Sequence, residues 1–372
     1  MSESNSIYFE LLDYFNKMPV GLPTSNSGVE IKILKLLFTE EEAHLAMKLN
    51  FTPQPLKKVY RKLRNNGLSL EELENKLEKM YEKGTIIRAL NDGEKLFLLA
   101  PFVPGIYEFQ LGRLTPELIT NVFQYFKQAY FEKEYNLPGI PQLRTIPIEK
   151  AVPIDLNIAS YDQIREIIDK SNYIGIMDCI CRKAHDLIGD PCKKTDLRKT
   201  CMTFGSAAKT FYEKGEAQFI SKEKAYELIE EFEEVGLVPQ PSNSQKPFVI
   251  CNCCGCCCEV LTNQKRFDNP ARLFATNFHA EVDSEICTGC GTCEERCNME
   301  AISIMDGLSA INLEKCIGCG VCIPTCPEDA INLAKNRVEV IPPSNTKETY
   351  IAIMNAKAEL AQAEKRGDIS EN

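Results

Sequence analysis

A repeated cysteine pattern near the C-terminal end most constrains how this 372-residue chain can fold. The segment ICTGCGTCEERCNMEAISI is followed by KCIGCGVCIPTCPEDAINL, and each copy contains the spacing C-x₂-C-x₂-C-x₃-C. A constant offset of 29 residues carries Cys287, Cys290, Cys293 and Cys297 onto Cys316, Cys319, Cys322 and Cys326. Two copies of one thiol-bearing loop, adjacent in sequence, predict a compact unit with pseudo-twofold symmetry.

The spacing itself has a chemical reason. Three thiolates on a tight loop can bind three irons of one cubane, while the fourth cysteine lies on the next helical turn and faces the other cluster. The pattern resembles the bacterial two-cluster ferredoxins, and this resemblance implies two 4Fe–4S clusters with crossed ligands. The expected ligands of one cluster are Cys287, Cys290, Cys293 and Cys326, and those of the other are Cys316, Cys319, Cys322 and Cys297.

One residue departs from the family pattern. Cys297 is followed by Asn298, where the family usually has proline, whereas Cys326 keeps Pro327. We expect the change to perturb one loop without removing the ligand. The alternative, a zinc site, is disfavoured because zinc ribbons use pairs of C-x₂-C and not triplets with a fourth x₃ partner.

Ten further cysteines lie upstream, and so dense a set of thiols in a reducing compartment indicates metal ligands. The candidate ligands are Cys179, Cys181, Cys192 and Cys201, and, within the stretch CNCCGCCC, Cys251, Cys253, Cys254 and Cys257. Neighbouring residues of an extended strand point to opposite faces, so Cys253 and Cys254, or Cys257 and Cys258, could serve different clusters or remain unligated.

Together with the C-terminal repeat, these two stretches resemble a set of anaerobe 4Fe–4S dicluster proteins with upstream CxCR and CNCCxCCC segments. The resemblance covers about residues 145–335. It implies redox chemistry, and we expect at least one additional 4Fe–4S cluster. The first choice of ligands for it is the group Cys179, Cys181, Cys192 and Cys201.

Two other side chains near these cysteines have alternative interpretations. Arg182 could offset the charge of a cluster or be an ordinary solvated arginine. His185 lies four residues after Cys181 and could be a ligand, although a lone histidine is more often structural.

The expected fold is α+β and multidomain. Residues 1–145 form a winged-helix-like domain, because a helix with Ser69 as N-cap, Glu72 at N3 and Gly84 as C-cap is followed by a hairpin turning at Asn91–Asp92–Gly93. Residues 146–280 form a cysteine-rich region, in which Ser160 caps a helix and the strand YIGIM leads to Cys179. Residues 281–340 form the dicluster ferredoxin domain, and residues 341–372 form a C-terminal amphipathic helix.

The charge distribution bears on partners. The formal net charge is −10, and residues 1–145 are balanced with 18 basic and 18 acidic side chains, so the remainder carries 25 against 35. An acidic chain repels phosphate backbones, and we expect no nucleic-acid partner. Redox proteins or oxidoreductase subunits with basic patches are the expected partners.

Missing motifs limit the chemistry. No G-x-G-x-x-G or G-x₄-G-K-[ST] occurs, and no apolar run is long enough to span a membrane. The start MSESNSIYFELL lacks a signal-peptide pattern, so a cytoplasmic location is expected. We therefore expect an electron-transfer component of a larger anaerobic oxidoreductase, without a substrate site of its own.

Two other classes remain. An iron–sulfur redox-sensing transcription regulator is the alternative suggested by the winged helix, in which the helix before a wing normally enters the major groove. Here that helix is SLEELENKLEKMYEKG, whose five glutamates against three lysines disfavour phosphate contact. A zinc-holding scaffold is the third class.

Overall fold

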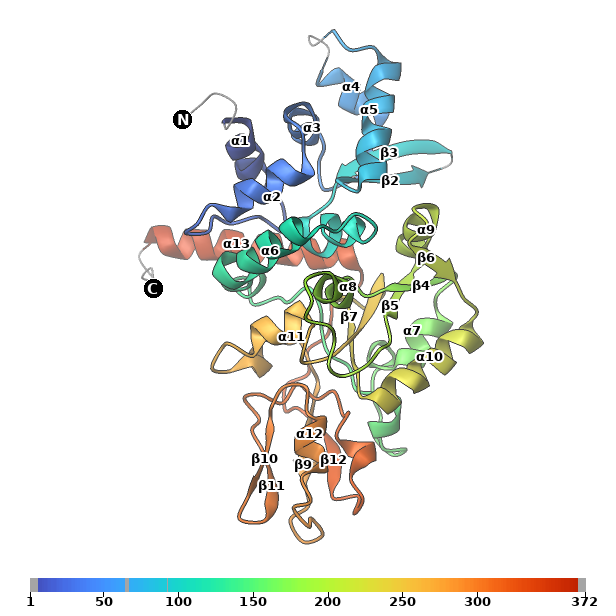
Figure 1. Cartoon of the computed structure of the whole chain (residues 1–372), viewed down its shortest axis with the longest axis vertical. Coiled ribbons are helices and arrows are strands. Elements are labelled where there is room, and N and C mark those ends of the chain that lie inside the picture. Colours follow the sequence, from blue (N-terminus) through green and yellow to red (C-terminus); the bar gives the residue numbers. More distant parts are fainter. Residues whose placement is uncertain (1–5, 64–66, 92, 367–372) are drawn as a thin grey trace. The chain divides into compact units, whose positions relative to one another are not determined.

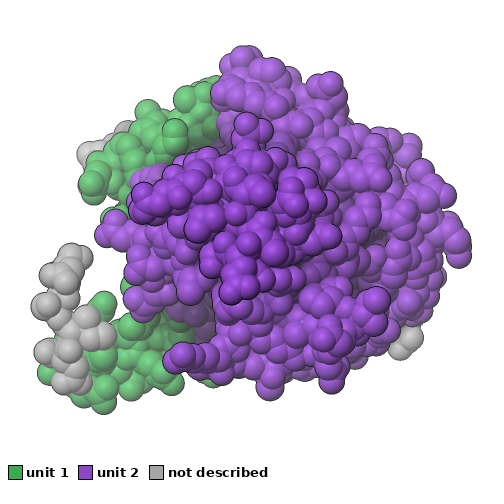
Figure 2. Space-filling view, turned by 90° about the horizontal axis from the view of Figure 1, so that it is seen from below, with its two compact units in different colours: residues 1–138, 350–372 green, residues 139–349 purple. Residues whose placement is uncertain are grey.

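The structure is a computed structural model that describes residues 6–63, 67–91 and 93–366. It is a mixed helix and strand protein, and its chain forms two compact units, coloured separately in Figure 2. Unit 1 comprises residues 1–138 and 350–372, and unit 2 comprises residues 139–349. The cysteine-rich and dicluster segments therefore belong to one unit, and the finer division into four segments stays a prediction.

Unit 1 is mainly helical. Its α-helices are α1 (Ser6–Phe15), α2 (Val29–Leu37), α3 (Glu40–Ala46), α4 (Leu56–Arg61), α5 (Leu70–Lys83), α6 (Pro116–Tyr125) and most of α13 (Thr346–Arg366). Helix α6 continues as a π-helical segment, Phe126–Tyr135, and shorter turns cover Phe102–Ile106 and Glu108–Gln110. The strands are β1 (Gln54–Pro55), β2 (Ile86–Asn91) and β3 (Glu94–Leu99).

Helix α5 and the hairpin after it begin and end as the sequence predicts. Ser69 and Glu72 form a reciprocal capping box, and Gly84 ends the helix with φ of 81°. Strands β2 and β3 then pair antiparallel, and β1 joins the other edge of β3. Asp92 of the predicted turn lies outside the described residues. The assignment of these elements to a winged-helix domain stays a prediction.

Unit 2 contains a five-stranded sheet in the order β6-β4-β5-β8-β7, with every neighbouring pair antiparallel (Figure 1). The strands are β4 (Ile174–Asp178), β5 (Lys199–Phe204), β6 (Ala217–Phe219), β7 (Val238–Pro241) and β8 (Val249–Cys253). The helices are α7 (Ile164–Asp169), α8 (Ile180–Leu187), α9 (Gly205–Glu213), α10 (Lys222–Val235) and α11 (Glu259–Gln264). Apolar side chains of α7 and α10, among them Ile168 and Phe232, pack with Met202 and Ile250 of the sheet into one core.

The predicted cap at Ser160 is wrong. Ser160–Asp162 forms a separate 3₁₀ turn, and α7 starts after Gln163, which makes no side-chain cap hydrogen bond. The β4 prediction is confirmed, because this strand ends at Asp178 and delivers Cys179 to the start of α8.

The dicluster segment follows in the same unit. It is built from β9 (Phe278–Val282), α12 (Thr292–Arg296), β10 (Ile302–Met305), β11 (Leu308–Ile311) and β12 (Ile331–Lys335). Strand β9 pairs with β12, and β10 pairs with β11, both antiparallel (Figure 1). The terminal helix expected from the sequence is α13, of which residues 346–366 are described. Within the described ranges, no helix is long and apolar enough to cross a membrane.

Candidate metal centres

The first group of thiols, the outer set, is Cys287, Cys290, Cys293 and Cys326. These four side chains line one pocket together with Gly289, Ser309 and Ala330. Three of them come from the first copy of the repeat and Cys326 comes from the second. The pocket thus brings Cys326 of the second copy together with three cysteines of the first, and the crossed ligation of the clusters stays a prediction.

The second group, the inner set, is Cys316, Cys319, Cys322 and Cys297. Burial and, to a smaller extent, the charges of Cys297 and Cys316 raise the pKa of Cys319 to about 12. Burial also raises the pKa values of Cys322 and Cys297, and the Cys316 thiol adds to both shifts. Cys297 of the first copy therefore lies among the cysteines of the second copy.

Backbone amides stabilise a thiolate in both sets. The Ala330 amide donates to Cys326 Sγ at 3.2 Å, and the Ala301 amide donates to Cys297 Sγ at 3.3 Å. Ala301 and Ala330 are equivalent positions of the repeat, 29 residues apart. Neighbouring strands supply two more donors, from the Ser309 amide to Cys287 Sγ at 3.4 Å and from the Ala280 amide to Cys316 Sγ at 3.5 Å. Such N–H···S bonds stabilise the negative charge that a reduced cluster and its thiolates share.

Two glycines of the repeat are required by close backbone approach. Gly289 has φ of +64°, and a Cβ there would lie 2.0 Å from the Gly307 carbonyl oxygen. Gly318 also has φ of +64°, and its Cβ would lie 2.1 Å from the Phe278 carbonyl oxygen. Both the left-handed conformation and the lack of space exclude a side chain at these positions.

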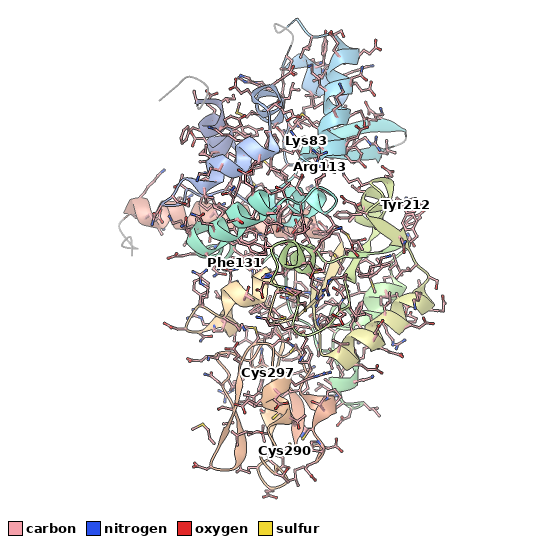
Figure 3. All side chains as sticks on the ribbon, in the orientation of Figure 1. Lys83, Arg113, Phe131, Tyr212, Cys290 and Cys297 are labelled. Atoms are coloured by element: carbon pink, nitrogen blue, oxygen red, sulfur yellow. The ribbon has the colours of Figure 1, made fainter. Side chains whose placement is uncertain are left out.

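The outer and inner sets differ in exposure. Cys290 is exposed, and hydrogen bonds from Thr292 lower its pKa, while the amide of Ser309 lowers that of Cys287. Each set has one buried cysteine, Cys293 in the outer set and Cys322 in the inner set, and burial is the main cause of the pKa shifts in the inner set. Figure 3 shows Cys290 at the far end of the dicluster segment, with Cys297 nearer to the five-stranded sheet of unit 2.

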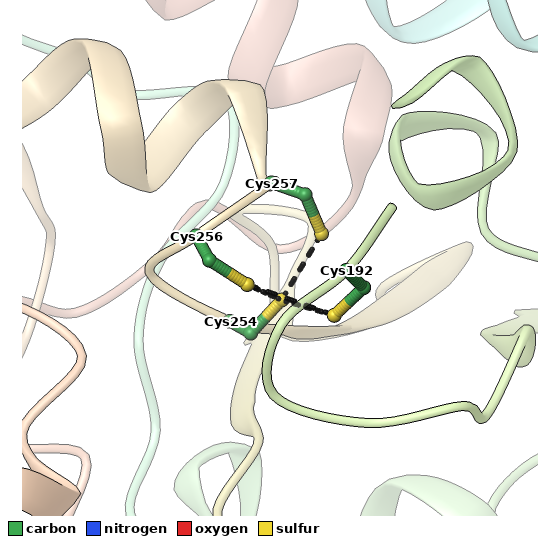
Figure 4. Close-up of side chains that lie close together, drawn as sticks. All are labelled: Cys192, Cys254, Cys256 and Cys257. Carbon is green, nitrogen blue, oxygen red and sulfur yellow. Dashed lines mark hydrogen bonds between the residues drawn. The ribbon is translucent and has the colours of Figure 1, made fainter. Parts of the chain in front are cut away.

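A third group, the four-thiol group, lies upstream. Its members are Cys192, in the loop after α8, and Cys254, Cys256 and Cys257, in the tight turn between β8 and α11 (Figure 4). Cys192 Sγ lies 3.6 Å from the sulfurs of both Cys254 and Cys256. The Sγ of Cys254 lies 3.5 Å from that of Cys256 and 3.2 Å from that of Cys257.

These sulfur–sulfur distances are close to those expected between the ligands of one tetrahedral metal ion. A metal–sulfur bond of 2.3 Å gives a sulfur–sulfur edge of about 3.8 Å in a tetrahedral site. Contact with Cys256 raises the pKa of Cys254 to about 11, and contact with Cys254 lowers that of Cys256. All four thiols can ionise together only if a metal ion neutralises them.

The remaining six upstream cysteines form a fourth group, the six-thiol ring: Cys179, Cys181, Cys258, Cys253, Cys251 and Cys201. Cys181 contacts Cys179 and Cys258, and Cys253 contacts Cys258. Cys251 contacts Cys253 and Cys201, so the contacts form one continuous series. The Cys179 charge also acts on both Cys251 and Cys253, so the start of the series lies near its other half.

Adjacent cysteines of the dense stretch are thus separated, as strand alternation allows. Cys254 and Cys257 pack in the core beneath the sheet, whereas Cys253 and Cys258 pack in a second core with Leu261. The group Cys179, Cys181, Cys192 and Cys201 is not brought together, because Cys192 lies in the four-thiol group and the other three lie in the ring. Cys256 and Cys258, absent from the predicted ligands, each belong to a group.

Arg182 lies between these two groups and is 1 % exposed, so the interpretation as a solvated arginine is wrong. Its Nη1 donates to Thr200 Oγ1 and, at 3.2 Å, to the Asn252 carbonyl oxygen. Burial lowers its pKa, but the charges of Cys179 in the ring and Cys254 in the four-thiol group outweigh burial and raise it. A single buried cation therefore faces both sets of sulfurs.

His185 interacts with carboxylates. Its Nε2 lies 3.3 Å from Glu259 Oε1, and its Nδ1 lies 3.5 Å from Asp190 Oδ2. The hydrogen bond with Glu259 raises the histidine pKa. These partners favour the structural interpretation of His185 over a role as metal ligand.

Asn298, the residue that departs from the ferredoxin pattern, joins the dicluster segment to the cysteine-dense turn. Its side chain accepts a hydrogen bond from the Gly255 amide at 2.9 Å and donates one to the Gly236 carbonyl at 2.9 Å. Arg296 donates to the carbonyls of Glu233 and Glu234 at the end of α10. The proline usual at position 298 could make neither side-chain bond, a role that the sequence pattern alone did not reveal.

Comparison with known families agrees with the geometry of the repeat. Residues 286–331 match the family model of the 4Fe-4S dicluster domain. No curated protein shows significant similarity to the chain. The donor set, the amide–sulfur bonds and the two obligatory glycines fit this assignment, so residues 286–331 are a 4Fe–4S dicluster domain and the chain binds multiple 4Fe–4S clusters.

Proposed function

We propose that this chain transfers electrons as a subunit or partner of a larger oxidoreductase. The outer set would hold one 4Fe–4S cluster and the inner set the other, and these clusters supply one-electron carriers when bound. The observation that carries the proposal is a difference in exposure: the outer set reaches the surface at Cys290, its exposed member, whereas all four cysteines of the inner set are partly or fully buried.

The surface around the outer set fits a basic redox partner. Exposed carboxylates lie near these cysteines in the sequence: Asp283, Glu285, Glu294, Glu295, Glu328 and Asp329. Glu328 lines the same pocket as the outer set, and Ile286, next to Cys287, is 47 % exposed and offers an apolar contact. Charge complementarity of this kind steers encounter with a basic surface and raises the association rate.

The inner set continues into the cysteine-rich part of the unit. Its Cys316, Cys319 and Cys297 pack against the same apolar core as Cys253 and Cys258 of the six-thiol ring. The backbone carbonyl of Cys319 accepts a hydrogen bond from the Ile148 amide at 3.0 Å, which fixes this loop on the body of unit 2. A redox-active ring would therefore lie on the inward side of the dicluster domain.

The charges of the predicted wing support protein docking over DNA binding. Lys95 pairs with Glu74 at 2.7 Å and with Glu78 at 2.9 Å, and Arg88 pairs with Glu78 at 2.8 Å. Basic side chains that are neutralised by α5 glutamates are poor ligands for phosphates. Nanomolar, sequence-specific DNA binding that depends on cluster oxidation state would instead support the regulator.

The docking face can be tested with a basic c-type cytochrome as electron acceptor. We expect the double variant Glu294→Gln and Glu295→Gln to slow cytochrome reduction about tenfold at low ionic strength and less at high salt, because these carboxylates steer the encounter. The matched control is Glu227→Gln with Glu231→Gln on α10, which removes the same charge from another exposed face of unit 2. Stopped-flow absorbance under anaerobic conditions measures the rates.

Equal slowing in both double variants would show that only net charge matters, and no slowing in either would remove the outer set from the docking face. Cluster content of each variant, measured as iron and acid-labile sulfide, separates a docking effect from cluster loss.

A further inference from the structure

We propose that the ten upstream cysteines build two separate metal centres of different nuclearity. The six-thiol ring binds a polynuclear iron–sulfur cluster, and the four-thiol group binds a single tetrahedral ion, zinc or iron. This division does not rest on the electron-transfer role of the dicluster domain, because it follows from the sheet register and from the distances between thiols.

The sheet register builds the ring. Cys201 of β5 lies directly opposite Cys251 of β8, and Cys253 lies two residues further along β8 on the same face. Strand β4 pairs with β5 and ends next to Cys179, which brings the start of α8, and with it Cys181, to the same edge. Cys258 closes the ring from the start of α11.

The distances separate the two centres by size. The four sulfurs of the four-thiol group all lie within 4.8 Å of one another, as the ligands of one ion must. Among the residues that the structure describes, no three thiols of the ring lie as close together, and the same is true of the outer and inner sets of the dicluster domain. The ring thiols therefore contact one another in pairs but not in threes, so one ion cannot bind all six, and several irons bridged by sulfide would be needed to do so.

The surroundings of the ring suit a buried anionic cluster. Cys253 and Cys258 are buried, so a cluster bound by them would be shielded from water on that side. In the described part of the chain, Nε and Nη2 of Arg182 are buried without a hydrogen-bond partner. Sulfur atoms of the two proposed centres would be acceptors for these donors, because Arg182 interacts with Cys179 of the ring and with Cys192 and Cys254 of the four-thiol group.

Metal analysis of the whole protein, purified without oxygen, tests the division. Three four-iron clusters give about twelve irons and about twelve acid-labile sulfides, to which the single ion adds one zinc or one iron without sulfide. Eight sulfides in the wild-type protein would overturn the proposal, because the dicluster domain alone accounts for them. That count decides the question even where a variant fails to fold.

Two matched double variants then assign the centres. Cys251→Ser with Cys253→Ser should remove about four irons and four sulfides and keep the single ion. Cys256→Ser with Cys257→Ser should remove the single ion and keep about twelve sulfides. Both pairs lie in the same eight-residue stretch, residues 251–258, and each variant removes two thiols, so the two variants are matched in position and in number.

The EPR signals of the reduced dicluster domain serve as the internal reference and should persist in both variants. The proposal is overturned if the Cys251 and Cys253 variant retains twelve sulfides, since the third cluster would then lie outside the ring. It is equally overturned if the Cys256 and Cys257 variant loses four sulfides, since the four-thiol group would then hold a cluster and not an ion.

Discussion

The side chain of Asn298 connects the dicluster domain to the cysteine-dense turn through hydrogen bonds, and a single substitution removes them. It is 7 % exposed and makes two hydrogen bonds of 2.9 Å, one with the Gly255 amide and one with the Gly236 carbonyl. Asn298→Ala removes both bonds without changing the backbone. The Gly255 amide and the Gly236 carbonyl are then left without these partners.

The expected magnitude follows from the burial of these groups. A buried donor or acceptor that loses its partner costs about 1–3 kcal/mol, and the Gly255 amide regains part of this from water because it is only partly buried. We therefore expect Asn298→Ala to lower the local stability of this contact by about 2–4 kcal/mol. At 1.36 kcal/mol per factor of ten, amide exchange in the two contacted segments accelerates about 30- to 900-fold.

Hydrogen–deuterium exchange with mass spectrometry under anaerobic conditions measures this effect on peptides that contain Gly236 and Gly255. Asn332→Ala is the matched control, because Asn332 is exposed on β12 of the same domain. Exchange within about threefold of the wild-type rate would refute the reasoning, since it corresponds to less than about 0.7 kcal/mol. Unchanged iron content shows that the effect is local.

Two further predictions concern the dicluster domain itself. Gly318→Ala should abolish one 4Fe–4S cluster, about four irons per chain, because its Cβ would lie 2.1 Å from the Phe278 carbonyl oxygen. The control is Gly291→Ala, where φ is +83° but the space around the residue is open. This control should keep its iron and lose about 1 kcal/mol of stability. Cys297→Ser should alter the EPR signal that Cys319→Ser alters and leave the signal sensitive to Cys290→Ser intact; the reverse pattern would mean that each copy of the repeat closes its own cluster.

The dicluster domain could be predicted from sequence because its information is local. The spacing of each copy places three cysteines on one loop, and the offset of 29 residues identifies the equivalent positions Gly289 and Gly318. The capping box of Ser69 was predictable for the same reason, since all of its atoms lie within one turn of helix. By contrast, Ser160 has the right residue type for a cap, but the chain makes a 3₁₀ turn there before α7 begins.

The grouping of the upstream cysteines could not be predicted, because it depends on pairing between distant strands. Cys201 meets Cys251 only through the register of β5 and β8, which nothing in either segment specifies alone. Strand alternation allowed Cys253 and Cys254 to lie on different sides, and they pack in different cores, but which metal each binds stays a prediction. Strand alternation could not predict that Cys192 lies beside Cys254, because Cys192 is in a loop and not in a strand.

Burial of polar side chains was also beyond the sequence. Arg182 follows Cys181 in a short polar stretch that is equally typical of an exposed helix. Its role as a cation between two thiol groups depends on Thr200 and Asn252, which reach it from β5 and β8.

The close fit of the second repeat against the rest of unit 2 limits how freely this domain can be exchanged between proteins. A Cβ on Gly320 would lie 2.4 Å from Ala151 Cβ, and Ile317 and Val321 are buried in a core that includes Ile148 and Val238. Excising residues 286–331 would expose this apolar face to water. Residues 286–331 can be recognised from the sequence as a separate domain, but in this chain they share an apolar core with the rest of unit 2. A transfer of this domain to another protein would therefore have to include the surface of unit 2 that covers this face.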